Sequence, residues 1–132
     1  MTNRENGERL IKEAERVFAR DLKSAWEEKD YNLTVRRAQE VVELVLKGAL
    51  KILGVDYPKI HDVGPVFKEQ ARSKLAHIKE DTLERVLEIS FWLGEARAPS
   101  FYLEKDYGEG DAQKALEDAE FVLKEIKRGI LL

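Results

Sequence analysis

The sequence contains no cysteine. This absence excludes structural disulfides, thiolate zinc sites and cysteine nucleophiles. The 132 residues include only three prolines and eight glycines, so few positions interrupt regular secondary structure. Apolar stretches are broken by Glu, Lys or Gly within about five residues, far short of a membrane span. The first ten residues carry charges throughout and lack an apolar core, so we expect no signal peptide and a cytoplasmic protein.

Excess charge of one sign is also absent. The 23 Lys and Arg residues against 26 Asp and Glu residues leave a net charge of −3. This balance attracts neither nucleic acid nor anionic membranes in general, so any contact with RNA requires a local basic patch. What the chain does have is 37% charged and 43% hydrophobic residues. This composition and length favour one domain, residues 1–132, with long salt-bridged helices around a buried core.

Apolar residues recur at spacings of three and four along most of the chain. This period predicts an all-α fold, an antiparallel up-and-down bundle of about five helices. The predicted helices run from Leu10 to about Glu28, Leu33 to Leu53, Pro65 to Ile78, Asp81 to Pro99, and Asp111 to Gly129. Gly54 is expected to end the second helix in the left-handed conformation.

Two further positions are expected to set helix ends. Asp81 and Glu84 have the spacing of a capping box, and Asp111 is expected to cap the last helix. Pro99 is expected to kink or stop the fourth helix.

The second predicted helix is apolar on almost every side between residues 41 and 53. Its one polar strip consists of Arg36, Glu40, Glu43, Lys47 and Lys51, which share a face because their spacings are three and four. A helix coated in this way belongs in the middle of the bundle. The strip is either an ordinary solvated face or the lining of a cleft or interface, and both interpretations remain open.

Three other residues are candidates for chemistry. His61 lies in a loop beside Asp62, and His77 lies on the third predicted helix. Neither has a nucleophile or carboxylate cluster nearby in sequence, so a structural or solvated role is the expectation for both. Arg97 lies near a helix end, where an arginine either binds the last carbonyl groups or holds an anion such as phosphate.

Several segments stand out by their order and spacing. They are ARDLKSA at 19–25, DYNLTVRRAQE at 30–40, VELVLK at 42–47, LGVDYPKIHD at 53–62, Arg97 with Tyr102, and DAQKALEDA at 111–119. Together, over about residues 19–125, they resemble the HEPN domain (higher eukaryotes and prokaryotes nucleotide-binding domain) of the small stand-alone prokaryotic type. The resemblance implies a homodimer that binds a nucleotide or RNA and works with a small nucleotidyltransferase, as in toxin–antitoxin pairs. It implies no metal and no cofactor.

Catalytic members of this family carry an arginine followed four to six residues later by a histidine, and they cleave RNA without metal at the dimer interface. Arg97 matches the arginine, but Tyr102 stands where the histidine is expected. Tyrosine titrates near pH 10, so it is a poor proton acceptor at neutral pH. His61 substitutes for the histidine only if the fold brings it near Arg97.

Our leading hypothesis is therefore nucleotide or RNA binding. Arg97 and Tyr102 would contact the ligand, and Arg36, Arg37 and Lys47 would add positive potential. One alternative is a metal-independent ribonuclease with a degenerate Arg-x4-Tyr site, in which Arg97 acts with Tyr102 or His61. The other is a purely structural protein-interaction module. The aromatic residues expected to support a homodimer are Phe91, Trp92, Phe101 and Tyr102.

Overall fold

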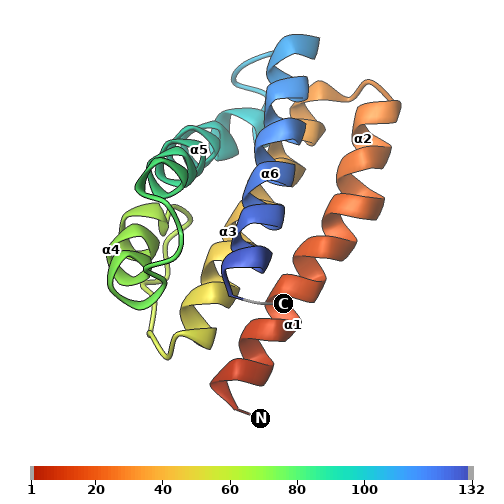
Figure 1. The fold of residues 1–132 in the computed structure, drawn as a ribbon. Helices are drawn as coiled ribbons and strands as arrows, with labels where there is room; N and C mark the ends of the chain where they lie inside the picture. Colours follow the sequence, from red (N-terminus) through yellow and green to blue (C-terminus); the bar gives the residue numbers. More distant parts are fainter. Residues whose placement is uncertain (1, 131–132) are drawn as a thin grey trace.

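The computed structural model describes residues 2–130, and in this range the chain consists of helices joined by turns and short loops (Figure 1). The helices are α1 (Asn3–Arg16), the π-helical segment η1 (Val17–Leu22), α2 (Lys23–Glu27), α3 (Tyr31–Ile52), α4 (Gly64–Lys74), α5 (Glu80–Phe101) and α6 (Glu109–Gly129). Because α1, η1 and α2 follow one another without a break, they form one rod. The predicted all-α bundle is confirmed.

The helix α3 lies at the centre of the bundle. It packs against α1, α5 and α6 and also contacts α4. Its apolar side chains Val41, Val45, Leu46 and Leu50 have no exposed surface, which confirms that the 41–53 segment belongs to the core. Contact with α1 is close at Gly48, because a Cβ atom there would lie 2.8 Å from the carbonyl oxygen of Gly7.

The first helix begins at Asn3 rather than at Leu10. The side chain of Thr2 accepts a hydrogen bond from the backbone N–H of Glu5 at 3.1 Å, and the Glu5 carboxylate reaches back toward the Thr2 backbone. This capping box satisfies the free N–H groups of the first turn. The expectation was wrong because residues 3–9 are mostly polar, so the apolar period becomes visible only after the helix has started.

The predicted start of α5 is also wrong. Asp81 lies inside the helix, which begins at Glu80 after Lys79 without a side-chain cap. Glu84 forms an ion pair with Lys68 of α4 and so is engaged elsewhere. Pro99 lies inside the last turn of α5 and does not stop it, since the helix continues to Phe101. At this position proline removes only one intrahelical hydrogen bond.

Two other ends differ from the prediction. The helix α4 ends at Lys74, which leaves His77 and Ile78 in the following turn. The helix α6 begins at Glu109 after Gly108, and Asp111 accepts a hydrogen bond from the Gly108 N–H at 3.0 Å from within the first turn. Gly54 does adopt the left-handed conformation after α3, with φ 75°.

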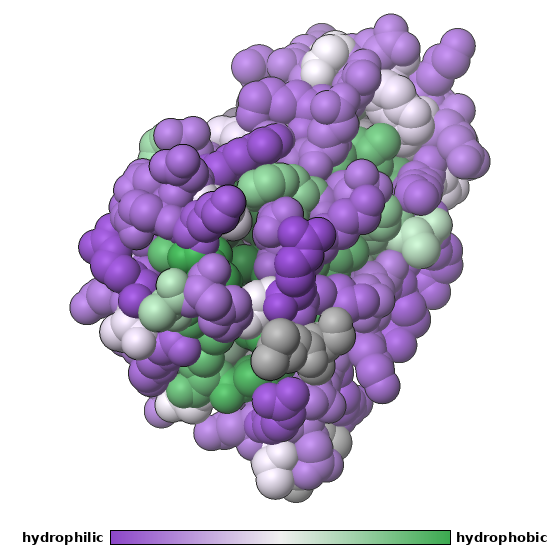
Figure 2. Space-filling model, in the orientation of Figure 1, coloured by the Kyte–Doolittle hydropathy of each residue, from purple (hydrophilic) through white to green (hydrophobic). Residues whose placement is uncertain are grey.

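The surface around these helices is mainly charged and polar. Figure 2 shows hydrophilic side chains over most of the face that carries α6, with hydrophobic side chains visible in the furrows between helices. Within residues 2–130, no helix has the length and apolar character needed to cross a membrane.

Candidate functional site

A cavity of about 400 Å³ lies between α3, α5 and the loop that precedes α4. We call it the α3–α5 cavity. Its lining residues are Arg36, His61, Gly94, Arg97, Ala98, Phe101 and Tyr102. The structure thus brings four of the predicted site residues, Arg36, His61, Arg97 and Tyr102, to one place.

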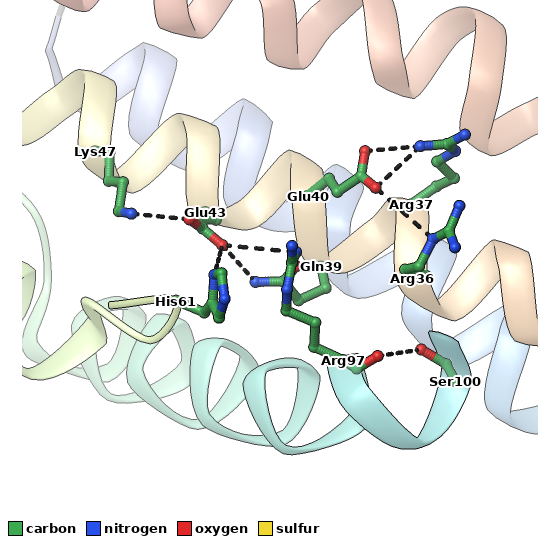
Figure 3. Close-up of polar contacts among 9 residues, drawn as sticks. All are labelled: Arg36, Arg37, Gln39, Glu40, Glu43, Lys47, His61, Arg97 and Ser100. Atoms are coloured by element: carbon green, nitrogen blue, oxygen red, sulfur yellow. Dashed lines mark hydrogen bonds and ion pairs between the residues drawn. The ribbon is translucent and has the colours of Figure 1, made fainter. Parts of the chain in front are cut away.

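The carboxylate of Glu43 organises the polar side chains beside this cavity (Figure 3). Its Oε1 accepts hydrogen bonds from Nε2 of Gln39 at 2.9 Å and from Nδ1 of His61 at 3.0 Å. Its Oε2 accepts one from Nζ of Lys47 at 2.8 Å. Arg97 donates to Oε1 of Gln39 at 2.7 Å and lies 4.0 Å from the Glu43 carboxylate. Arg97 and His61 are therefore held by one shared network.

This network keeps Glu43 ionised. Burial raises the pKa of the carboxyl, but hydrogen bonds from Lys47, Gln39 and His61 and the charge of Lys47 outweigh burial, so the pKa lies below its usual value. Since the folded state has the lower pKa, ionised Glu43 stabilises the fold above the unfolded-state pKa of about 4.3. That contribution is lost as the pH falls through the folded-state pKa.

The variant Glu43→Gln is expected to lose less stability in acid than the unaltered protein, because glutamine does not titrate. We expect the difference in unfolding free energy between about pH 7 and pH 3.5 to be smaller in this variant. Urea unfolding followed by circular dichroism at both pH values measures it. Glu88→Gln is the matched control, since Glu88 is exposed and has no ion-pair partner within residues 2–130. Equal acid losses in Glu43→Gln and the unaltered protein would contradict the assigned role.

His61 is fixed from two sides. Because a carboxylate only accepts, the Nδ1–H of His61 donates to Glu43, and a neutral ring then has Nε2 available as an acceptor. That nitrogen has no hydrogen-bond partner among residues 2–130. The next residue, Asp62, accepts hydrogen bonds from Ser90 Oγ at 2.6 Å and from the Gly64 N–H at 3.0 Å. The loop that carries His61 is thereby tied to α4 and α5.

Aromatic rings form one end of the cavity. The guanidinium carbon of Arg36 lies 4.8 Å from the centre of the Phe101 ring. The Phe101 ring meets the Tyr102 ring edge-on, with 4.8 Å between their centres. Tyr102 is 68% exposed, so its ring lies at the rim rather than inside.

Sequence comparison identifies the family. The family model of the HEPN domain matches residues 7–129, nearly the whole chain. The chain belongs to the HEPN family. Membership indicates a function related to nucleotides or RNA, and HEPN domains commonly dimerise. No curated protein and no solved structure matches this HEPN chain.

Two predicted site residues of this HEPN domain, Arg37 and Lys47, do not line the cavity, and neither does His77, for which a structural or solvated role was expected. Arg37 binds both oxygens of Glu40, at 2.9 and 3.0 Å. Lys47 is held by Glu43, as described above. His77 lies in the turn after α4, where its Nε2–H donates to the carbonyl oxygen of Gly129 at 2.6 Å, so it closes the end of α6. In the described part of the chain, acidic and histidine side chains form no cluster able to hold a metal ion.

Two residues that position the site were not singled out from the sequence. Gln39 is buried and bridges Arg97 to Glu43. The sequence feature that could have revealed it is an amide side chain four positions before Glu43, on the same face of an otherwise apolar helix. Asn32 donates to the Lys105 carbonyl and accepts from the Tyr107 N–H, both at 2.8 Å. Asn32 also donates to the Ser100 carbonyl at 3.3 Å, next to Phe101. All three partners of Asn32 lie 68 or more positions away, so no local pattern reveals them.

Proposed function

We propose that this HEPN domain binds a nucleotide or a short piece of RNA in the α3–α5 cavity. The observation that carries the proposal is the convergence of Arg36, His61 and Arg97 on one open cavity beside exposed aromatic rings. Arg97 uses Nη1 to hold Gln39, and within residues 2–130 the other N–H groups of its guanidinium have no hydrogen-bond partner. A guanidinium presented in this way can hold a phosphate with two parallel hydrogen bonds.

The aromatic end of the cavity suits the other part of a nucleotide. Phe101 and Tyr102 are both more than half exposed. A base that stacks on an aromatic side chain gains about 1–3 kcal/mol in single-strand binders. The cavity therefore offers a cationic part for phosphate and an aromatic part for a base.

A thermal-shift screen of the purified protein against nucleotides and short RNAs tests this proposal. A ligand that binds only the folded state raises the melting temperature in a concentration-dependent way. We expect such a rise with at least one nucleotide or RNA. If none changes the melting temperature, the binding proposal fails and the protein-interaction module becomes the better hypothesis.

The proposed partner is a small nucleotidyltransferase, with the two proteins acting as a toxin–antitoxin pair. Family resemblance alone supports this part. Co-expression with a nucleotidyltransferase encoded beside this chain is expected to give a complex that co-elutes in gel filtration. Expression of the HEPN chain alone is expected to arrest growth. Normal growth, with no complex at micromolar concentration, would contradict the pairing.

We further propose that the protein forms a homodimer through the exposed face of α5. Phe91 is 58% exposed and Phe101 53%, and Gly94 and Ala98 lie between them on the same face because the spacings are three and four. Trp92 does not belong to this surface, because its indole N–H donates to the Asp118 carboxylate at 2.9 Å and the ring is half-buried. Gly94, Ala98 and Phe101 also line the α3–α5 cavity, so pairing through this face would place the two cavities at the interface, and a ligand there would contact both protomers.

Light scattering is expected to give twice the chain mass of 15.2 kDa. Phe91→Glu is expected to shift the protein toward monomer, because a charge would be buried without a partner. Gln113→Glu is the control, since it adds the same charge at an exposed position of α6. A monomer mass from micromolar to millimolar concentration would remove the homodimer proposal.

One observation favours a second candidate function, metal-independent RNA cleavage. His61 lines the same cavity as Arg97 and presents Nε2 as a proton acceptor. In such a reaction Nε2 takes the proton of a ribose 2′-hydroxyl, and the 2′ oxygen bonds to the adjacent phosphorus. The bond from phosphorus to the 5′ oxygen breaks, and that oxygen takes a proton from water. Arg97 would stabilise the charge on the phosphoryl oxygens.

This candidate requires cleavage in the presence of a chelator, with 2′,3′-cyclic phosphate and 5′-hydroxyl ends. His61→Ala would abolish that cleavage and Tyr102→Phe would preserve it. RNA binding without any cleavage would leave binding as the function.

A further inference from the structure

A second cavity, of about 470 Å³, lies between α1 and the end of α3. We call it the α1–α3 cavity. Asn6, Arg9, Glu13 and Arg16 of α1 line it, together with Lys51 of α3 and Tyr57. Three cationic side chains thus face a single carboxylate, although the whole chain has a net charge of −3. The lining is a local basic patch of the kind that contact with RNA requires.

The positive charge of this lining is only partly compensated. Arg16 pairs with Glu13 at 2.7 Å. Lys51, in contrast, has no carboxylate within 4 Å among residues 2–130, and its Nζ lies 5.6 Å from the centre of the Tyr57 ring. An anion entering the cavity would therefore meet an ammonium group that no acidic side chain already holds.

The two cavities lie along one polar strip of α3. Arg36 lines the α3–α5 cavity and Lys51 lines the α1–α3 cavity. Lys47 lies between them, where it binds Glu43 and lies 5.2 Å from the centre of the Tyr57 ring. The carboxylates of the strip are paired, Glu40 with Arg37 and Glu43 with Lys47. The strip therefore carries no uncompensated negative charge that would repel a phosphate backbone.

We propose that the α1–α3 cavity is a second phosphate-binding site and that the ligand is single-stranded RNA lying along α3 from Arg36 to Lys51. This inference rests on the proposed function of the α3–α5 cavity and specifies its ligand as a strand. Arg36 and Lys51 are 15 positions apart on one helix, a separation of about 22 Å. One nucleotide cannot span it, whereas a strand that keeps the stacked rise of about 3.4 Å per nucleotide does so with about seven nucleotides, and a more extended strand needs fewer.

The test is a length series of RNA oligonucleotides, with binding read by fluorescence anisotropy at fixed salt. We expect affinity to rise from two nucleotides to about eight and then to level off, because about seven nucleotides reach both sites. Lys51→Gln is expected to weaken binding of an 8-mer roughly threefold and to reduce its salt slope by about 0.7. A dinucleotide is too short to bridge the two cavities, so its binding in the α3–α5 cavity, which Lys51 does not line, should not change.

Glu13→Gln makes the opposite change. It removes the one carboxylate of the lining and releases Arg16, so we expect tighter binding of the 8-mer and unchanged binding of the dinucleotide. A merely structural role of this surface predicts no such gain. Lys124→Gln is the control, because it removes one exposed positive charge from α6, which lines neither cavity. Circular dichroism of each variant verifies that it is folded.

The outcomes separate this inference from the proposed function. If the dinucleotide binds but affinity does not rise with length, the second site is wrong and the first stands. If Lys51→Gln and Glu13→Gln leave 8-mer binding unchanged, the strand does not reach the α1–α3 cavity. If no oligonucleotide binds, both proposals fail. Tighter binding of single-stranded DNA than of RNA of equal length would overturn the choice of RNA.

Discussion

Replacing Leu46 with alanine is expected to lower the free energy of unfolding by about 2–5 kcal/mol. Leu46 has no exposed surface and lies on α3, which packs against α1, α5 and α6. The truncation removes buried apolar atoms and leaves a cavity. Helices around a central helix cannot close this cavity without disturbing their contacts with one another, so we expect little relief by collapse.

Urea unfolding at neutral pH measures this loss. Leu103→Ala is the matched control, because it removes the same atoms from a side chain that is 71% exposed. Position 103 has a positive φ of 58°, but leucine and alanine both carry a Cβ atom, so the substitution does not change the backbone strain there. We expect this control to lie within about 0.5 kcal/mol of the unaltered protein. A loss below about 0.5 kcal/mol at Leu46 as well would mean that α3 is not the core of the bundle.

Replacing Arg97 with alanine is expected to weaken nucleotide or RNA binding about 10- to 100-fold, because hydrogen bonds to a charged group contribute about 1.5–3 kcal/mol. The guanidinium is the cavity's best-placed phosphate ligand, since the network of Gln39 and Glu43 holds it from behind. The bundle should remain folded. The free energy of unfolding should fall by about 1–3 kcal/mol, since the buried side-chain amide oxygen of Gln39 would lose its hydrogen-bond donor.

Two further variants make the Arg97 experiment decisive. Arg97→Lys keeps the charge but lacks the planar fork, so we expect an affinity between those of the unaltered protein and the alanine variant. Arg128→Ala removes an arginine whose side chain is 75% exposed on α6, and its affinity should be unchanged. Full ligand affinity in a folded Arg97→Ala variant would show that the binding site lies elsewhere, with Arg97 serving only to hold Gln39.

The sequence by itself determined the helical architecture. Apolar periodicity and breaker residues act over a few positions, so they revealed the central helix α3 and the left-handed Gly54 after it. The segments that resemble HEPN domains are likewise written along the chain, and the family match to residues 7–129 confirms the family. Two helix starts were predicted wrongly for different reasons. The start of α1 has a local signal, the Thr2–Glu5 capping box, but no apolar period follows it until Leu10. Glu84, in contrast, pairs with Lys68 of α4 instead of capping α5.

The tertiary structure alone decided which polar residues meet. His61 was expected to be structural or solvated because no nucleophile or carboxylate cluster lies near it in sequence, yet the loop before α4 brings it to Glu43, 18 positions earlier. Arg97 reaches Gln39 across 58 positions, and the interpretation of the α3 strip as a cleft lining depends on α1 and α5 flanking it. Such contacts depend on the course of loops and on how helices pack. The spacing of residues along one helix gives no information about either, so only the folded chain shows which residues form the site.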